Sequence, residues 1–179
     1  MSTSRLVTIA QIEGRARAAG SEFVLACDMR FAAPESAIFG QFESALGSSP
    51  GAGAIQHLTR LMGRGRALEV MLSAQDYDAE LAERYGWINR ALPAAALGDF
   101  VRSLAFRITS FRLAAALQSR IGSTQSRSRR WDFSQDSDLF GDSVQGSDAQ
   151  GRIRVATTRG FQTREGEMTL ARMLGELER

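Results

Sequence analysis

The chain has 179 residues, 44% of them hydrophobic, which is the size and composition of about one globular domain. All 22 basic residues are arginine, and His57 and Cys27 are the single histidine and cysteine. A catalytic lysine, a His/Cys metal cluster, a CxxC pair and an internal disulfide are therefore excluded, which leaves carboxylates, hydroxyls and the backbone for chemistry. A formal charge of +2 is too small to indicate a nucleic-acid partner, and no apolar run reaches the ~18 residues of a membrane span, so we expect a cytoplasmic protein.

Strand-like and helix-like segments alternate from residue 5 to about 92, which predicts an α/β fold. Apolar and β-branched residues predict strands at 5–13, 29–33 and 36–40. Helical spacing predicts helices at 21–28, 54–62, 65–73 and 78–86. A Gly/Ser/Pro-rich loop, 40–53, separates the last strand from the later helices, and 87–93 is an extended exit segment.

From residue 93 onward only helices are predicted, so we divide the chain into a core, 1–92, and a C-terminal helical region, 93–179. The helices are expected at 94–111, 112–121 and 147–161. The tail, 162–179, is polar, and we expect it to be only partly ordered. The basic cluster 120–130 is interpreted as a solvated helix face or loop, because it lacks the Gly-rich or aromatic interleaving typical of a polyanion site.

The start of the helix near Gly20 is a candidate functional position. The first N–H groups of a helix lack intrahelical acceptors and carry partial positive charge, and small residues at 18–21 let a ligand approach them. Glu22 lies in this first turn, from which a carboxylate can face the same ligand. The alternative, which sequence physics alone favours, is that Glu22 is an ordinary first-turn acid.

Glu43 is the second candidate, because it follows an apolar strand and lies in the Gly-rich loop, where positioned catalytic groups often occur. The alternative is a solvated loop acid. Three other residues have weaker claims: His57 is expected to have a structural or surface role, Cys27 to be a small buried hydrophobe, and Asp28 to make local hydrogen bonds.

Taken together, these stretches resemble the enoyl-CoA hydratase/isomerase family, the crotonases. The likeness rests on the ordered series "TIAQIEGRARAAGSEFVLACDMRFAAPESAIFGQFESALGSSPGAG" and its continuation to about residue 93, with further similarity in "FSQDSDLFGDSV" and "RGFQTREGE". It implies the later part of a crotonase-like ββα spiral, followed by a C-terminal helical oligomerisation region that packs between subunits of trimers or paired trimers.

The resemblance also implies a chemistry. Crotonases bind an acyl-CoA thioester and stabilise its enolate-like oxyanion with two backbone N–H groups, and two glutamates of the hydratases handle water and a proton. The matching positions are Glu22 and Glu43 as acid/base groups, Ala19 as one oxyanion N–H, and Gly20 and Gly51 beside the substrate. No metal is implied, and no cofactor beyond the coenzyme A of the substrate. Hydratase and isomerase activities, and the acyl chain, are left open.

The chain also departs from the family pattern. Family members carry a substantial segment before the position of Thr8, which supplies the second oxyanion N–H, so the resemblance is to an N-terminally truncated member. Phe42 stands where the family usually has Pro, and Ala18 where it often has Gly. A rival expectation is therefore a non-catalytic fragment that acts as an interaction module with a full-length relative.

Overall fold

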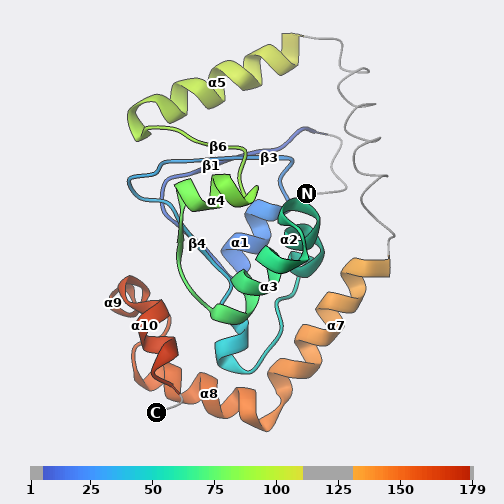
Figure 1. Cartoon of the computed structure of the whole chain (residues 1–179), viewed down its shortest axis with the longest axis vertical. Coiled ribbons are helices and arrows are strands. Elements are labelled where there is room, and N and C mark those ends of the chain that lie inside the picture. Colours follow the sequence, from blue (N-terminus) through green and yellow to red (C-terminus); the bar gives the residue numbers. More distant parts are fainter. Residues whose placement is uncertain (1–5, 111–130, 178–179) are drawn as a thin grey trace.

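The computed structural model describes residues 6–110 and 131–177, in which helices surround two small three-stranded sheets (Figure 1). The first sheet is parallel, in the order β1-β3-β6, with strands β1 (Ile9–Ile12), β3 (Met29–Ala32) and β6 (Arg90–Ala91). The second has the order β2-β4-β5, with strands β2 (Arg15–Arg17), β4 (Ile38–Gly40) and β5 (Tyr77–Asp78). Its β2 and β4 run parallel, and β5 is antiparallel to β4.

The helices of the core agree closely with their predicted positions. They are α1 (Ala19–Leu25), α2 (Ala54–Met62), α3 (Arg64–Ser73) and α4 (Ala79–Tyr85). Asp78 caps the start of α4 by accepting a hydrogen bond from the Leu81 N–H at 2.7 Å, and Gly86 ends it in the left-handed conformation that glycine favours. The sequence did not predict the short strands β2 and β5, or the 3-10 helix η1 (Glu43–Leu46) inside the loop.

An aromatic cluster joins the second sheet to the helices of the core. Trp87 and Phe39 are fully buried, and their ring centroids lie 5.5 Å apart. The ring of Tyr77 lies 5.9 Å from that of Trp87, which brings β4, β5 and the end of α4 into contact. Aromatic side chains bury large apolar areas, so this cluster is the centre of the main hydrophobic core.

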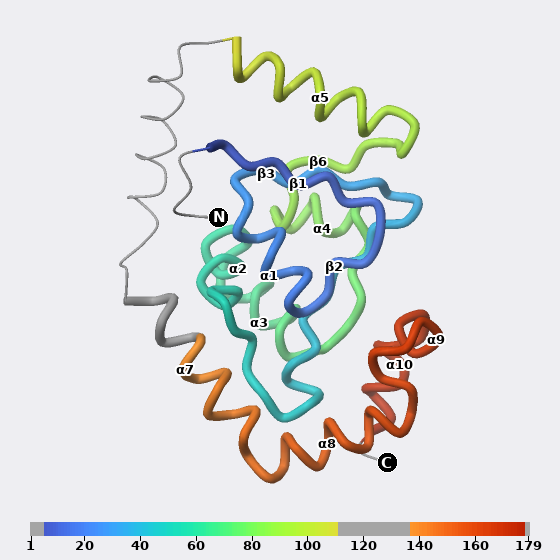
Figure 2. Tube along the Cα trace, turned by 180° about the vertical axis from the view of Figure 1, so that it is seen from behind, coloured from blue at the N-terminus to red at the C-terminus, as the bar shows by residue number. Residues whose placement is uncertain are grey.

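The C-terminal helices lie on two opposite sides of this core (Figures 1 and 2). Helix α5 (Ala94–Ser110) covers the first sheet, with the rings of Phe31 and Phe100 in edge contact at 5.0 Å. Helices α7 (Trp131–Gln145) and α8 (Ser147–Thr158) curve around the far side and lead into α9 (Arg164–Met168) and α10 (Leu170–Gly175). The predicted helix 112–121 and the basic cluster 120–130 lie outside the described residues.

The tail is more ordered than its polar composition predicts. Leu170, Met173 and Leu174 are buried and pack with Leu46 of η1. Their three- and four-residue spacing gives the helix one narrow apolar face, and the average composition of the segment is still polar. Among the described residues, no helix has both the length and the hydropathy needed to cross a membrane.

Candidate active site

Both candidate carboxylates follow strands that end at the same edge of the second sheet. Strands β2 and β4 are parallel, with Arg17 opposite Gly40, so the chain leaves both strands in the same direction. The Ala18 N–H donates a hydrogen bond to the Gly40 carbonyl at 3.0 Å, which ties the two exits together. In parallel α/β sheets, ligands bind outside the carboxyl ends of the strands. The segment with Glu22 and the segment with Glu43 therefore begin side by side.

The first segment turns sharply from β2 into α1. Ala18 has φ 44° and ψ −120°, a conformation natural to glycine and strained for alanine by about 1–3 kcal/mol. The turn makes Ala19 the first residue of α1, where its N–H has no acceptor within the helix. A Cβ atom added to Gly20 would meet nothing within 4 Å, so the space beside this helix start is open. Ala19 and Gly20 are themselves exposed.

Glu22 is oriented by the Gly-rich loop. Its Oε1 accepts a hydrogen bond from the Gly51 N–H at 2.9 Å. A Cβ atom on Gly51 would lie 3.3 Å from two atoms of the Phe140 side chain, so α7 packs tightly over this loop. The Gly51 N–H, which the family resemblance places beside the substrate, is thus engaged with Glu22.

Glu43 begins η1 and is 5% exposed. Its Oε2 is buried and makes no hydrogen bond to any described residue. Both the Ser48 N–H and the Ser48 Oγ donate to the Glu43 carbonyl, at 3.0 and 3.2 Å, and Gly47 closes the turn. Phe42 has φ −114°, an angle that a proline ring cannot adopt, so its backbone ahead of Glu43 differs from that of a family member with proline there.

The environment raises the pKa of Glu43 from 4.5 to about 7. Burial is the largest cause, and the negative charge of Glu22 raises it further, while the backbone N–H groups of Glu43 and Phe42 act in the opposite direction. The fold thus brings the two glutamates close enough to influence each other. A carboxyl group with a pKa near neutrality is suited to both donating and accepting a proton.

Two further polar side chains at this edge were not singled out from the sequence. Ser21 and Gln41 are fully buried, and neither the Ser21 Oγ nor the Gln41 side-chain amide bonds to any described residue. Buried polar groups are normally paired, so unpaired ones indicate a functional or hydrated site. The available signal was their position beside the two candidate glutamates, Ser21 directly before Glu22 and Gln41 two residues before Glu43.

The C-terminal helices support the loop that carries Glu43. The rings of Phe42 and Phe161 meet edge to face at 5.7 Å, and the Ser49 N–H donates to the Ser143 Oγ at 3.1 Å. A Cβ atom on Gly47 would lie 3.2 Å from the Cα of Ala149 in α8. Residues of α7, of α8 and of the segment that follows α8 thus pack against the loop that carries Glu43.

Two of the minor candidates, Cys27 and Asp28, have the surroundings predicted for them. Cys27 is buried, and burial is the main cause that raises its thiol pKa. The Asp28 carboxylate accepts hydrogen bonds from the Thr8 N–H at 2.8 Å and the Thr8 Oγ1 at 2.9 Å. His57 lies half-buried in α2. Within residues 6–110 and 131–177, no group of three or more His, Cys, Asp or Glu side chains is placed to hold a metal ion.

Known proteins similar to the chain share this fold. A crystal structure of a Streptomyces avermitilis protein assigned as an enoyl-CoA hydratase superposes with a TM-score of 0.95 and 49% sequence identity, over 98% of this chain and 64% of that one. This likeness confirms the predicted α/β spiral with its helical C-terminus.

Curated relatives point the same way. A probable enoyl-CoA hydratase of Mycobacterium bovis is 38% identical over 116 residues, which are 65% of this chain and 45% of the relative. A short-chain-enoyl-CoA hydratase of Clostridium acetobutylicum is 37% identical over 102 residues, 57% of this chain and 39% of the relative. The chain thus spans about half the length of these relatives or less. The sequence model of the enoyl-CoA hydratase/isomerase family matches residues 1–164, and the chain belongs to that family.

Proposed function

We propose that the chain carries out enoyl-CoA hydratase/isomerase chemistry on an acyl-CoA thioester. In this proposal the Ala19 N–H binds the thioester oxygen as negative charge develops on it, and Glu22 and Glu43 are the acid/base groups. Polarising the carbonyl acidifies the adjacent carbon, so carboxylates suffice to move the proton. Coenzyme A enters as part of the substrate, and no separate cofactor is required.

The buried Glu43, with its pKa near 7 beside a second carboxylate, is the observation that carries this proposal. For hydration, Glu22 takes a proton from water as the water oxygen bonds to the β-carbon, and protonated Glu43 supplies a proton to the α-carbon. As the α-carbon takes this proton with the electron pair of the enolate C=C bond, the oxygen lone pair re-forms the C=O double bond and the negative charge on the thioester oxygen disappears. The hydrogen bond from the Gly51 N–H keeps Glu22 oriented during this step.

The test is the loss of enoyl-thioester absorbance when the chain is mixed with crotonyl-CoA. We expect turnover that falls by about 10²–10⁴-fold in Glu22→Gln and in Glu43→Gln, which is the usual contribution of a general acid or base. Glu80→Gln, an exposed change in α4, is the matched control and should retain turnover. A cooperatively melting chain without turnover would refute the proposal.

A second candidate function is an interaction module that assembles with a full-length relative. Within the described residues β1 pairs only with β3, so its other edge is free of strand partners, and Phe106 of α5 is 74% exposed. An open strand edge and an exposed aromatic side chain favour association with another chain. Size measurement of the chain alone and mixed with a full-length relative tests this role: a mixed trimer supports it, and separate species refute it.

A further inference from the structure

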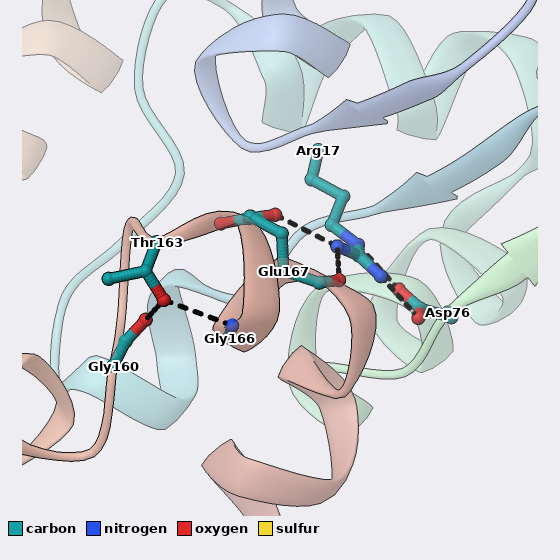
Figure 3. Close-up of polar contacts among 6 residues, drawn as sticks. All are labelled: Arg17, Asp76, Gly160, Thr163, Gly166 and Glu167. Atoms are coloured by element: carbon teal, nitrogen blue, oxygen red, sulfur yellow. Dashed lines mark hydrogen bonds and ion pairs between the residues drawn. The ribbon is translucent and has the colours of Figure 1, made fainter.

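Arg17, at the end of β2, is a buried cation that the chemistry proposed above does not use. Its side chain is 5% exposed. The Nε and Nη2 donate to the two oxygens of Asp76 at 2.7 and 2.6 Å, and the Nη1 donates to the Glu167 carbonyl at 2.7 Å and the Glu167 Oε2 at 2.9 Å (Figure 3). Three of these four hydrogen bonds end on carboxylate oxygens. Only the planar guanidinium of arginine can direct hydrogen bonds to two carboxylates in this way.

The group remains charged in this position. Burial alone lowers the pKa of Arg17, but hydrogen bonds and charges from Asp76 and Glu167 together raise it above its ordinary value. Arg17 is buried, whereas the side chains of Asp76 and Glu167 are 34% and 35% exposed. Removing one partner of such a pair leaves an uncompensated charge, so Arg17 and its two carboxylates hold one another in place.

The geometry imposed here joins three distant parts of the chain. Asp76 precedes β5, and Glu167 lies in α9, so Arg17 connects the sheet to residues 59 and 150 positions away. The approach of α9 is itself constrained: the Thr163 Oγ1 accepts from the Gly166 N–H at 3.1 Å (Figure 3). A Cβ atom on Gly166 would clash with the Gly160 carbonyl oxygen, so only glycine fits there. The tail is therefore shaped to present Glu167 to Arg17.

The next residue after Arg17 is the strained Ala18. Its N–H is held by the Gly40 carbonyl, and Gly40 also packs on the ion pair, because a Cβ atom there would lie 3.5 Å from the Arg17 Cγ and 3.6 Å from the Asp76 Oδ1. A backbone in an unfavourable conformation persists only when its surroundings fix it on both sides. Arg17 fixes the sheet side of this turn, and the Glu22 N–H, donating to the Ala18 carbonyl at 2.9 Å, fixes the helix side.

We propose that Arg17 is a positioning residue that couples the docked C-terminal helix α9 to the turn 18–22, and thereby sets the direction of the Ala19 N–H. The effect on turnover rests on the proposed function, whereas the effect on the turn does not. Loss of the contact between Arg17 and α9 should therefore loosen the turn as well as the tail.

Amide hydrogen exchange measured by NMR on the full chain tests the coupling without any substrate. In Arg17→Met we expect the Ala18 and Glu22 amides to exchange at least about tenfold faster, together with the Glu167 amide of α9. The Trp87 amide, bonded to the Ala82 carbonyl, is the internal reference and should not change. Arg15→Met, the same substitution at an exposed position of the same strand, should change none of them. Faster exchange confined to α9 would overturn the proposal.

Turnover of crotonyl-CoA gives the second readout. We expect Arg17→Met to lower kcat by about 10–100-fold while KM changes less than about threefold, because the donor is displaced and not removed. If the wild type turns over crotonyl-CoA and Arg17→Met has the same kcat, the role of Arg17 is contradicted. A wild type without turnover would refute the proposed function, and the exchange data would still decide the coupling.

Asp76→Asn covers the case in which Arg17→Met does not fold, since Arg17 then keeps both bonds to Glu167. The same amides should exchange faster by a smaller factor. Unchanged exchange at Ala18 and Glu22 in a folded Asp76→Asn chain would overturn the proposal.

Discussion

The turn 17–22 and the loop 40–53 leave the same sheet edge, but different parts of the molecule hold them. The turn is held by backbone bonds within the core, from Ala18 to Gly40 and from Glu22 to Ala18, and its one described link to the C-terminal helices is the bond of Arg17 to Glu167. The loop is held from outside, by side chains of α7 to α10. Two catalytic candidates can therefore share one site and still depend on different packing. The C-terminal helices are as much a part of the site as the sheet.

The largest effect is expected from removing the support of the loop. Leu170→Ala empties a buried position in the cluster that holds Leu46 of η1, and such truncations typically cost about 2–5 kcal/mol. Urea unfolding monitored by circular dichroism measures the loss. The comparison predicts that amides of η1, which packs directly on Leu170, lose more protection than those of α1, which among the described residues is linked to the tail only through Arg17 and Glu167. Equal loss in both elements would show that the two segments share one support.

The next largest effect is the pH dependence of the free energy of unfolding, which we expect to come from Glu43. Because the pKa of Glu43 is raised in the fold, its protonated form stabilises the fold below about pH 4.5, and this contribution is lost as the pH rises through about 7. Glu43→Gln cannot ionise at this position and so escapes that loss. The free energy of unfolding of the variant minus that of the wild type should therefore rise by up to roughly 3 kcal/mol between pH 4 and pH 8. Urea unfolding at the two pH values measures this.

Glu22→Gln sharpens the same measurement. The charge of Glu22 contributes to the raised pKa of Glu43, so its removal should shift the carboxyl titration of Glu43, followed by ¹³C NMR, to lower pH. A Glu43 titration that does not move would mean that the two groups are not coupled.

How far the sequence predicted this arrangement depends on whether the signal was local. Helices α2 and α4 were placed almost to the residue, because apolar spacing and a closing glycine lie within one short window. Strand β2 was missed, because its three residues include two arginines, and only pairing with β4 makes it a strand. Helix α7 was missed as well, since its polar sequence shows little periodicity and it packs on segments far away in the chain, helix α2 and the Gly-rich loop.

The same distinction applies to the site. Glu22 and Glu43 were found because a helix start and a Gly-rich loop are local features, reinforced by the family resemblance. The hydrogen bond between Glu22 and Gly51 spans 29 residues, and that between Arg17 and Glu167 spans 150. No local pattern encodes such pairs. The local sequence shows only that Arg17 lies between two alanines. Its burial is unusual for an arginine, but it depends on partners far away in the chain.

The smallest effect concerns the strain in the turn. Ala18→Gly relieves a φ of 44° that suits glycine, but glycine also gains freedom in the unfolded chain, so we expect a net gain of up to about 1 kcal/mol. Ala52, which also has φ 44° but lies exposed in the loop, is the matched control. If the turn is held from within the core, Ala18→Gly should stabilise the chain without changing exchange in α8. A gain that vanishes in Arg17→Met would indicate that Arg17 is what forces the strained conformation, because the freed turn would then relax in alanine and glycine forms alike.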